Sequence, residues 1–372
     1  MNSNPPTEHR YPCPSCRANL LFEPKDGKLT CPYCGRVEVL TQEGGEVVEN
    51  SFEEYLQAPS TELKKLAENS LTVGCTGCGA AVSFTPPVVA TKCPFCGVAI
   101  VTQPTSSDPV VAPQGVLPFK VTRQAAINSV RDWLSSRWFA PNALKRFARQ
   151  EGISGVYLPY WTYDSFTTTP YTGERGDHYW VEERYTERDS NGNTVQRTRS
   201  VQRTRWSFAA GTVQEFFDDV LVPAVTSLPI KTLNELEPWD LPSLVAYNPG
   251  YLAGFQALQY QKGMKEGYRD AQRVMEDEIS HLIRRDIGGD EQRIHSRTTH
   301  YSAITFKHLL LPVYIGAYRY QERSFQVLVN ARTGEVQGAR PYSYWKIAFA
   351  VICGIVAIIL FIALAQSQGN YQ

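Results

Sequence analysis

The fold of the N-terminal region is decided by the stretch 13-CPSCRANLLFEPKDGKLTCPYC-34, which returns 62 residues later as 75-CTGCGAAVSFTPPVVATKCPFC-96. Both stretches follow the pattern C-x2-C-x14-C-x2-C. Residues between and after the cysteines share the same offset, such as Phe22 with Phe84 and Gly35 with Gly97. This correspondence indicates an internal duplication of one small unit.

Each unit has the cysteine spacing of a four-ligand metal site. A CxxC turn brings two thiolates toward one ion, and the hairpin between two such turns lets them close a tetrahedral site. Four protein ligands leave no open coordination position, so we predict two structural zinc sites in two zinc ribbons. The predicted Zn²⁺ ligands are Cys13, Cys16, Cys31 and Cys34 in ribbon 1, and Cys75, Cys78, Cys93 and Cys96 in ribbon 2.

Two other chemistries stay open for these cysteines. The Cys-Pro-x-Cys-Gly turn also suits iron, and a CxxC pair can be redox-active, although redox pairs usually accompany a βαβ pattern. The N-terminus has no apolar run typical of a signal peptide, which favours a reducing compartment and metal over disulfides. The ninth cysteine, Cys353, lies in an apolar stretch; palmitoylation is conceivable there, but we favour an inert apolar role.

The charge of the ribbon region argues against binding to nucleic acid. Residues 1–104 hold eight Lys and Arg against eleven Asp and Glu, a net charge of −3. Eight thiolates and two Zn²⁺ ions would bring this to −7. Because phosphate binding requires a cationic face, contact with a protein is the better hypothesis for the ribbons.

The periodicity and composition predict a multi-domain α+β protein. Ser51-Phe-Glu-Glu54 is typical of a capping box that opens a short helix between the ribbons. The predicted order is zinc ribbon 1 (8–45), a helical spacer (46–69), zinc ribbon 2 (70–102), a Pro- and Ser-rich linker (103–115), a mixed α+β domain with antiparallel strands and a long helix (116–340), and one transmembrane helix (346–366).

In the α+β domain we predict strands at 156–163, 178–188 and 194–208, with a hairpin turn at Asn191-Gly192. The apolar stripe of 250–287 predicts one long helix. Leu311-Pro-Val-Tyr314 resembles Leu158-Pro-Tyr-Trp161, a weak indication of two related halves.

The strand 194–208 carries VQRTR twice, and strand alternation places four arginines on one face. These are Arg197, Arg199, Arg203 and Arg205. Such a stripe could meet nucleic acid or anionic lipid. We favour the alternative, in which the arginines pair across the hairpin with Glu182, Glu183 and Glu187.

The segment 347–365 holds nineteen uncharged apolar residues, enough for a helix of about 28 Å across a bilayer. Tyr342, Tyr344 and Trp345 precede it where interfacial aromatics belong, and Arg340 and Lys346 lie on the same side. We therefore predict a single-pass inner-membrane protein, with its N-terminal bulk in the cytoplasm and a short C-terminal tail outside.

The sequence carries no P-loop, no dinucleotide fingerprint after a strand, no HExxH and no GxSxG, so it offers no argument for an enzyme.

The whole pattern resembles a known family. The two ribbons are followed by YLPYWTYD, YTGERGD, YNPGYLAGFQ and LLPVYIGAYRYQERSFQVLVNARTGEVQGARPYS. This arrangement resembles bacterial membrane proteins with TFIIB-type zinc ribbons, often labelled primosomal protein N′ or PriA-like helicase. Some members resemble anchors that recruit phage-shock-type or SPFH-type proteins to the membrane. The resemblance implies the eight cysteines above as zinc ligands, and no catalytic residues.

From these observations we expect a membrane-anchored, non-enzymatic adaptor whose ribbons dock a partner protein at the cytoplasmic face. The expected partner is of the SPFH or phage-shock type, with the bilayer contacted through 347–365. The alternative is a membrane-tethered, DNA-associated protein of replication or repair.

Overall fold

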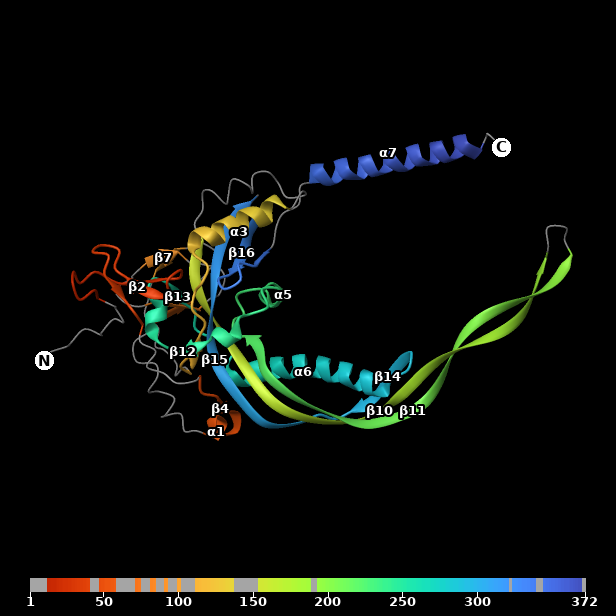
Figure 1. Ribbon diagram of the computed structural model, residues 1–372, viewed down its shortest axis with the longest axis horizontal. Helices are drawn as coiled ribbons and strands as arrows, with labels where there is room; N and C mark the ends of the chain where they lie inside the picture. The colour runs from red at the N-terminus through yellow and green to blue at the C-terminus, as the bar shows by residue number, and fades with distance from the viewer. Residues whose placement is uncertain are drawn as a thin grey trace.

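The structure, a computed structural model, describes residues 12–40, 47–57, 71–74, 81–84, 90–92, 99–101, 111–136, 153–188, 193–320, 323–338 and 344–369. Its body is built on one ten-stranded sheet with the main strand order β11-β10-β15-β16-β17. Small ribbons lie at one end of this body, and a two-stranded arm extends from the other end (Figure 1).

The elements of the body have the following bounds. Its long strands are β10 (Ser154–Arg188), β11 (Thr194–Pro223), β15 (His300–Tyr320), β16 (Arg323–Asn330) and β17 (Val336–Gly338). Short strands are β4 (Asn50–Ser51), β9 (Gly115–Val116), β12 (Val245–Ala246), β13 (Gln256–Ala257) and β14 (Glu291–Arg297). The helices are α1 (Phe52–Gln57), α3 (Arg123–Ser135), α5 (Ile230–Asn234), α6 (Met264–Ile287) and α7 (Tyr344–Gly369), with 3₁₀ turns η2 (Leu241–Ser243) and η3 (Pro249–Leu252).

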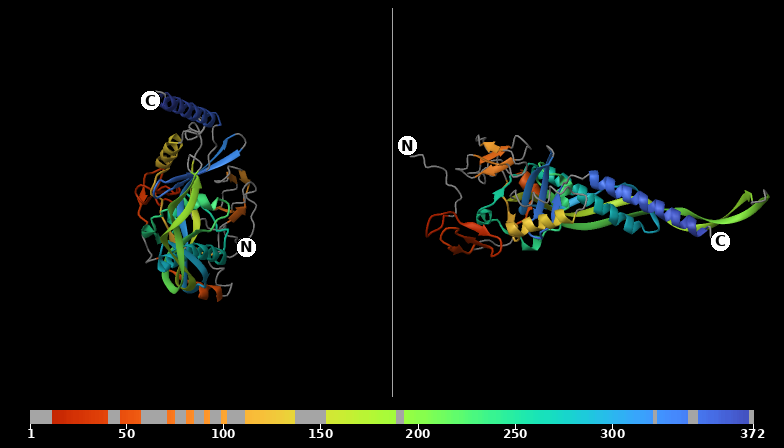
Figure 2. Two further views of the ribbon diagram at one scale, coloured as in Figure 1. Left: turned by 90° about the vertical axis from the view of Figure 1, so that its right-hand side faces the viewer. Right: turned by 90° about the horizontal axis from the view of Figure 1, so that it is seen from above.

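The ribbons form separate small sheets. Ribbon 1 is a three-stranded sheet of β1 (Leu21–Glu23), β2 (Lys28–Thr30) and β3 (Val37–Glu38). Ribbon 2 consists of the hairpin of β5 (Leu71–Gly74) with β6 (Ala81–Phe84) and the hairpin of β7 (Ala90–Lys92) with β8 (Ala99–Val101). The two ribbons flank the end of the body from opposite sides (Figure 2).

Strand β10 lies between β11 and β15 in the sheet. It pairs antiparallel with β11 from Tyr160 to Arg188, and with β15 from Ser154 to Thr168. The two Leu-Pro motifs meet here, because Leu158 lies directly opposite Leu311 in the β10–β15 register. Their resemblance therefore marks two neighbouring strands of one core.

The helices bury regularly spaced apolar residues on this sheet. Helix α3 buries Ala126, Val130 and Leu134, and α6 buries a longer row of Ala271, Met275, Ile279, Ile283 and Ile287. Helix α6 approaches the strands so closely at Gly267 that an added Cβ would lie 2.6 Å from the Tyr163 hydroxyl. Only glycine leaves room for this contact.

The predicted α+β class is wrong, because the described chain is mostly β and its helices are few. The predicted strands at 156–163 and 178–188 are one continuous strand, β10, since Pro170, Gly173 and Gly176 are accommodated within the ladder. The predicted helix over 250–287 begins only at Met264. Pro249 opens a 3₁₀ turn instead, and Gly254 takes φ +87°, which breaks helical geometry.

The prediction of a transmembrane helix at 346–366 is also wrong, and with it the inner-membrane localisation. The predicted contact of 347–365 with a bilayer stays a prediction. A membrane span requires about 20 consecutive apolar residues. Among the helices within the described ranges, none reaches the length and apolarity needed to cross a bilayer.

The predicted capping box is confirmed in part: the Glu54 N–H donates to the Ser51 hydroxyl at 3.4 Å at the start of α1. The hairpin turn at Asn191-Gly192 lies outside the described residues, but its flanking strands pair from Arg188 opposite Thr194. The segment boundaries stay predictions.

Candidate metal centre

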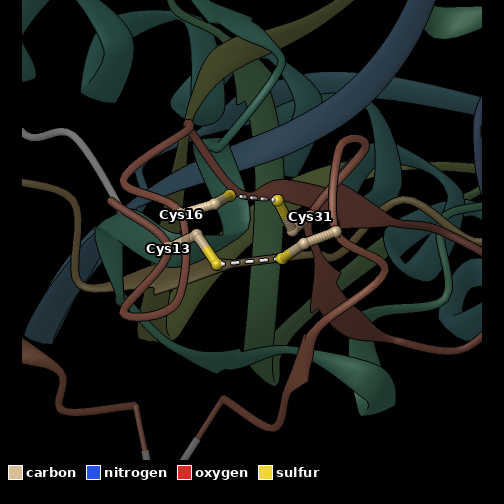
Figure 3. Close-up of side chains that lie close together, drawn as sticks. Cys13, Cys16 and Cys31 are labelled. Carbon is tan, nitrogen blue, oxygen red and sulfur yellow. Dashed lines mark hydrogen bonds between the residues drawn. The ribbon is translucent and has the colours of Figure 1, made fainter.

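Four cysteines of ribbon 1 converge on one point (Figure 3). The Sγ atoms of Cys13 and Cys34 lie 3.4 Å apart, as do those of Cys16 and Cys31. All four sulfurs lie within 4.8 Å of one another. The structure therefore brings together the four residues that the spacing predicts for the first site.

This arrangement fits a tetrathiolate metal ion. At a Zn–S distance of about 2.3 Å, the sulfurs of a tetrahedral site lie roughly 3.8 Å apart, close to the separations found here. A disulfide would need about 2.05 Å, so the four thiols are free ligands. The cluster can hold one zinc ion, and its four thiolates would close the coordination sphere.

The two CxxC turns share one backbone geometry. The Cys13 N–H donates to the Ala18 carbonyl at 2.7 Å, and the Cys31 N–H donates to the Arg36 carbonyl at 2.8 Å. The residue after each second cysteine is left-handed, with φ +63° at Arg17 and +71° at Gly35. Arg17 thus carries a side chain where the other turn uses glycine, at a cost in backbone strain.

Backbone N–H groups tune the thiols. The N–H of Cys34 has the largest influence on Cys31 and lowers the pKa of its thiol to about 6. Burial acts to raise the pKa of Cys13, but N–H groups led by that of Cys16 lower it overall. The Ala18 N–H acts to lower the pKa of Cys16, yet the neighbouring sulfurs raise it to about 12. A divalent cation would favour the thiolate form of all four.

Ribbon 1 packs its inner face on the segment 249–257 of the body. The Phe22 N–H donates to the Ala253 carbonyl at 2.9 Å, and the Phe22 ring lies 5.4 Å from that of Tyr251. Gly254 meets Leu21, which lies 3.1 Å from where a Cβ would stand. Cys13 and Cys31 are themselves buried in the same apolar cluster as Tyr251. The inner face of the metal site is therefore part of the body's core.

The outer face of ribbon 1 remains exposed. The Tyr33 side chain, between Cys31 and Cys34, is 83% exposed, and on or next to the edge strand β3 Val37 and Val39 are 52% and 69% exposed. Ribbon 1 thus has an inner face that is buried against the body and an outer face that exposes apolar side chains.

The second ribbon repeats the strand register of the first. Its cysteines lie outside the described residues, so the second zinc site stays a prediction. Its backbone pairs, however, repeat those of ribbon 1 at the same offset of 62 residues. Pro12–Asn19, Leu29–Glu38 and Thr30–Val37 recur as Gly74–Ala81, Thr91–Ile100 and Lys92–Ala99. Strand β6 of this ribbon lies against β13 of the body.

The arginine stripe of β11 is paired across the hairpin. Arg199 and Arg203 contact Glu183 at 2.7 and 3.4 Å, and Arg197 contacts Glu187 at 3.2 Å. These ion pairs confirm the predicted cross-strand pairing for two of the three glutamates. Glu182 lies opposite Ser200 instead, on the other face of the hairpin.

The structure also forms an acidic cluster that the sequence patterns did not indicate. Carboxylates of Asp164, Asp218 and Asp219 lie within 4.8 Å of one another on strands β10 and β11. The Lys307 ammonium lies 2.6 Å from Asp219 and 3.0 Å from Glu49, which precedes β4. Lysine therefore supplies the positive charge that these carboxylates need, and the network fastens the segment between the ribbons to the sheet. Its members are far apart in the chain, so no local motif could reveal it.

Comparisons with known proteins agree with a zinc ribbon. The uncharacterized protein YdjG of Bacillus subtilis (strain 168) is 24% identical over 376 residues, covering 97% of this chain and 99% of YdjG. Transcription factor S of Methanocaldococcus jannaschii is 33% identical over 85 residues, covering 23% of this chain and 64% of that protein. No family model matches the chain, and no solved structure matches it.

The four-cysteine cluster and the similarity to Transcription factor S together fit a zinc ribbon. They lend no support to the membrane or PriA-like helicase labels that the resemblance suggests.

Proposed function

We propose that this protein is a non-enzymatic zinc-ribbon adaptor, in which metal-stabilised ribbons present a docking surface to a partner protein. The proposal rests on the difference between the two faces of ribbon 1. Its inner face is fixed on the segment 249–257, while Tyr33, Val37 and Val39 remain open on its outer face. An apolar patch beside a rigid structural metal site is suited to protein contact.

The proposal includes a second zinc ion. Cys75, Cys78, Cys93 and Cys96 follow the spacing of the first site, and the hairpins around them repeat the register of ribbon 1. The outer apolar positions recur as well: Phe95 corresponds to Tyr33, and Val101 to Val39. Two copies of one docking surface would let a partner bind with avidity.

The family resemblance favours a partner of the phage-shock or SPFH type. The charge of the ribbon region supports a protein over a polyanion, since residues 1–104 carry a net −3 before the thiolates are counted.

Metal content and partner capture test the proposal together. We expect two zinc ions per chain by elemental analysis, one after Cys31→Ser, and one after Cys93→Ser. Cys353→Ser, outside both sites, is the matched control and should keep two. The variant Tyr33→Ser/Val39→Ser should keep both ions yet bind much more weakly to a purified candidate partner that binds the native chain. A partner retained by both this variant and the cysteine variants would contradict the docking role.

A second candidate function is association with nucleic acid, favoured by the similarity to a transcription factor over 85 residues. The arginine stripe of β11 gives this function little support, because three of its four arginines are paired with glutamate. Titration of duplex and single-stranded DNA over a salt series separates the two functions. Binding with a steep salt dependence that is lost in Arg197→Gln/Arg203→Gln would favour this second function.

A further inference from the structure

The two-stranded arm consists of Asp177–Arg188 of β10 and Thr194–Arg205 of β11. Strand β14 pairs with β10 only from Tyr171 to Gly176, and β15 pairs only as far as Thr168. Beyond these points the arm has no third strand within the described part of the chain, and it stands clear of the body (Figure 1). Isolated two-stranded ribbons are marginally stable in water. An arm of twelve cross-strand pairs is therefore expected to pack against another surface.

One face of the arm continues the face that α6 covers in the body. Ala209, Val213 and Phe217 of β11 belong to the cluster formed with α6, and Tyr171 of β10 donates a hydrogen bond to Asp286 of α6 at 2.6 Å. Odd-numbered residues of both strands share this face. The face continues along the arm past the end of α6 at Ile287, where the described part of the chain packs nothing on it.

This uncovered face is divided lengthwise by charge. The β10 side carries acidic and aromatic residues, the β11 side carries arginines, and two valines face each other near the middle. The pairs along the face are Asp177–Arg205, Tyr179–Arg203, Val181–Val201, Glu183–Arg199, Tyr185–Arg197 and Glu187–Val195.

We propose that a second copy of the chain covers this face, with two arms packed face to face about a two-fold axis that runs along the arm. Such an axis places β10 of one copy over β11 of the other at the same level. Glu183 of one copy then meets Arg199 of the other, and Val181 meets Val201. At three other levels a carboxylate or tyrosine ring of one arm also meets an arginine of the other.

The other face-to-face symmetry is unfavourable. A two-fold axis perpendicular to the arm, through the Val181–Val201 level, stacks each strand on its own copy. Arg199 would then meet Arg203, and Arg197 would meet Arg205, with like charges in contact. The charge pattern therefore selects parallel arms.

The ion pairs within each arm leave room for these contacts. The side chains of Arg197, Arg199 and Arg203 are 60%, 60% and 54% exposed although each contacts a glutamate. An arm about 40 Å long and ~10 Å wide offers roughly 400 Å² per copy, half of a standard interface. The arms alone should therefore give a weak, concentration-dependent dimer.

A charge-swap experiment on the full-length protein tests the dimer. Sedimentation over a concentration series should show self-association of the native chain. Glu183→Arg and Arg199→Glu should each weaken it by about tenfold or more, because each creates two like-charge contacts per dimer. A mixture of the two variants should form a heterodimer, since the arginine introduced at position 183 of one copy then faces the glutamate introduced at position 199 of the other. The double variant Glu183→Arg/Arg199→Glu should self-associate again.

Rescue by mixing distinguishes pairing between arms from pairing within an arm. Within each single variant the cross-strand contact stays repulsive, so only contacts between copies can restore association. Glu182→Arg, on the opposite face, is the matched control and should leave self-association unchanged. A native chain that stays monomeric at every concentration, or variants that do not associate on mixing, would overturn the proposal. So would a monomer whose arm binds DNA with a salt dependence abolished by Arg199→Glu.

Discussion

Ribbon 1 and the sheet body are stabilised by different means. Ribbon 1 has three short strands, and its buried apolar side chains are few: Leu20, Phe22 and Leu29 beside Cys13 and Cys31. The body buries three large apolar clusters around β10 and β15, one of which it shares with ribbon 1, and Trp161, Tyr157 and Tyr160 are almost inaccessible to solvent. The fold of ribbon 1 therefore depends mainly on its four metal ligands, while the fold of the body depends on apolar packing.

Metal removal should produce the largest difference between ribbon 1 and the body. Structural zinc contributes about 10–16 kcal/mol to the folding of small ribbons, so chelation or Cys31→Ser should unfold residues 12–40. We expect rapid proteolysis of this region and loss of its amide protection in hydrogen exchange, while β10 and β15 stay protected. Cys353→Ser should change neither. A chelated protein whose ribbon keeps full protection would show that the body alone holds it folded.

Truncation of the core should have the reverse effect. Trp161 is fully buried, and its indole N–H donates to the Lys262 carbonyl at 2.9 Å. Trp161→Ala should destabilise the body by about 3–5 kcal/mol in denaturant unfolding, with zinc content unchanged. Trp180→Ala, on the arm and 66% exposed, is the matched control, and its effect should stay below about 0.5 kcal/mol. Equal effects of the two changes would contradict the assignment of Trp161 to the core.

Acidification should lower the free energy of unfolding of the body by a smaller amount. Burial lowers the pKa of His308 to about 4, while an unfolded histidine titrates near 6.5. The unfolded state therefore binds the proton first, so the body's stability is complete above pH 6.5 and falls between pH 6.5 and 4. The loss is about 3 kcal/mol.

The measurement is denaturant unfolding of the chelated protein at a series of pH values, which removes the titration of the zinc ligands. His308→Gln should flatten the curve between pH 6.5 and 4, and any residual slope belongs to other groups such as Asp164. An unchanged slope would show that His308 is charged or exposed in the folded state.

The smallest effect concerns the strained turn of ribbon 1. Arg17→Gly should relieve the left-handed backbone, with a net gain of about 0.5–1 kcal/mol after the added freedom of glycine in the unfolded chain. Zinc affinity measured against a competing chelator should rise by about two- to fivefold. The mirror change, Gly35→Arg, should lower affinity by a similar factor. If both substitutions shifted the zinc affinity in the same direction, the two turns would not be equivalent.

The sequence predicted the first metal site because its ligands are local. Cys13 to Cys34 fall within one hairpin, and the spacing specifies how they converge. The pairing of the arginine stripe was predictable for the same reason, since the strands are adjacent in the chain.

The body was harder to predict because its elements depend on distant partners. Asp164, Asp219 and Lys307 meet only when β10, β11 and β15 are aligned. The apolar spacing of 250–263 fits a helix as well as a loop that packs against ribbon 1, and Gly254 decides for the loop. The extension of β10 to 35 residues likewise depends on pairing with β11, β14 and β15.

The contact between Phe22 and Ala253 has a consequence for the order of events during synthesis. Ribbon 1 is synthesised more than 200 residues before the segment 249–257 on which it packs. At ~5–20 residues per second this interval lasts roughly 10–40 s. During that time the thiols have only one another and an ion as partners. Timely capture of zinc by the nascent chain would thus protect four cysteines from oxidation before the protein's own core can shelter them.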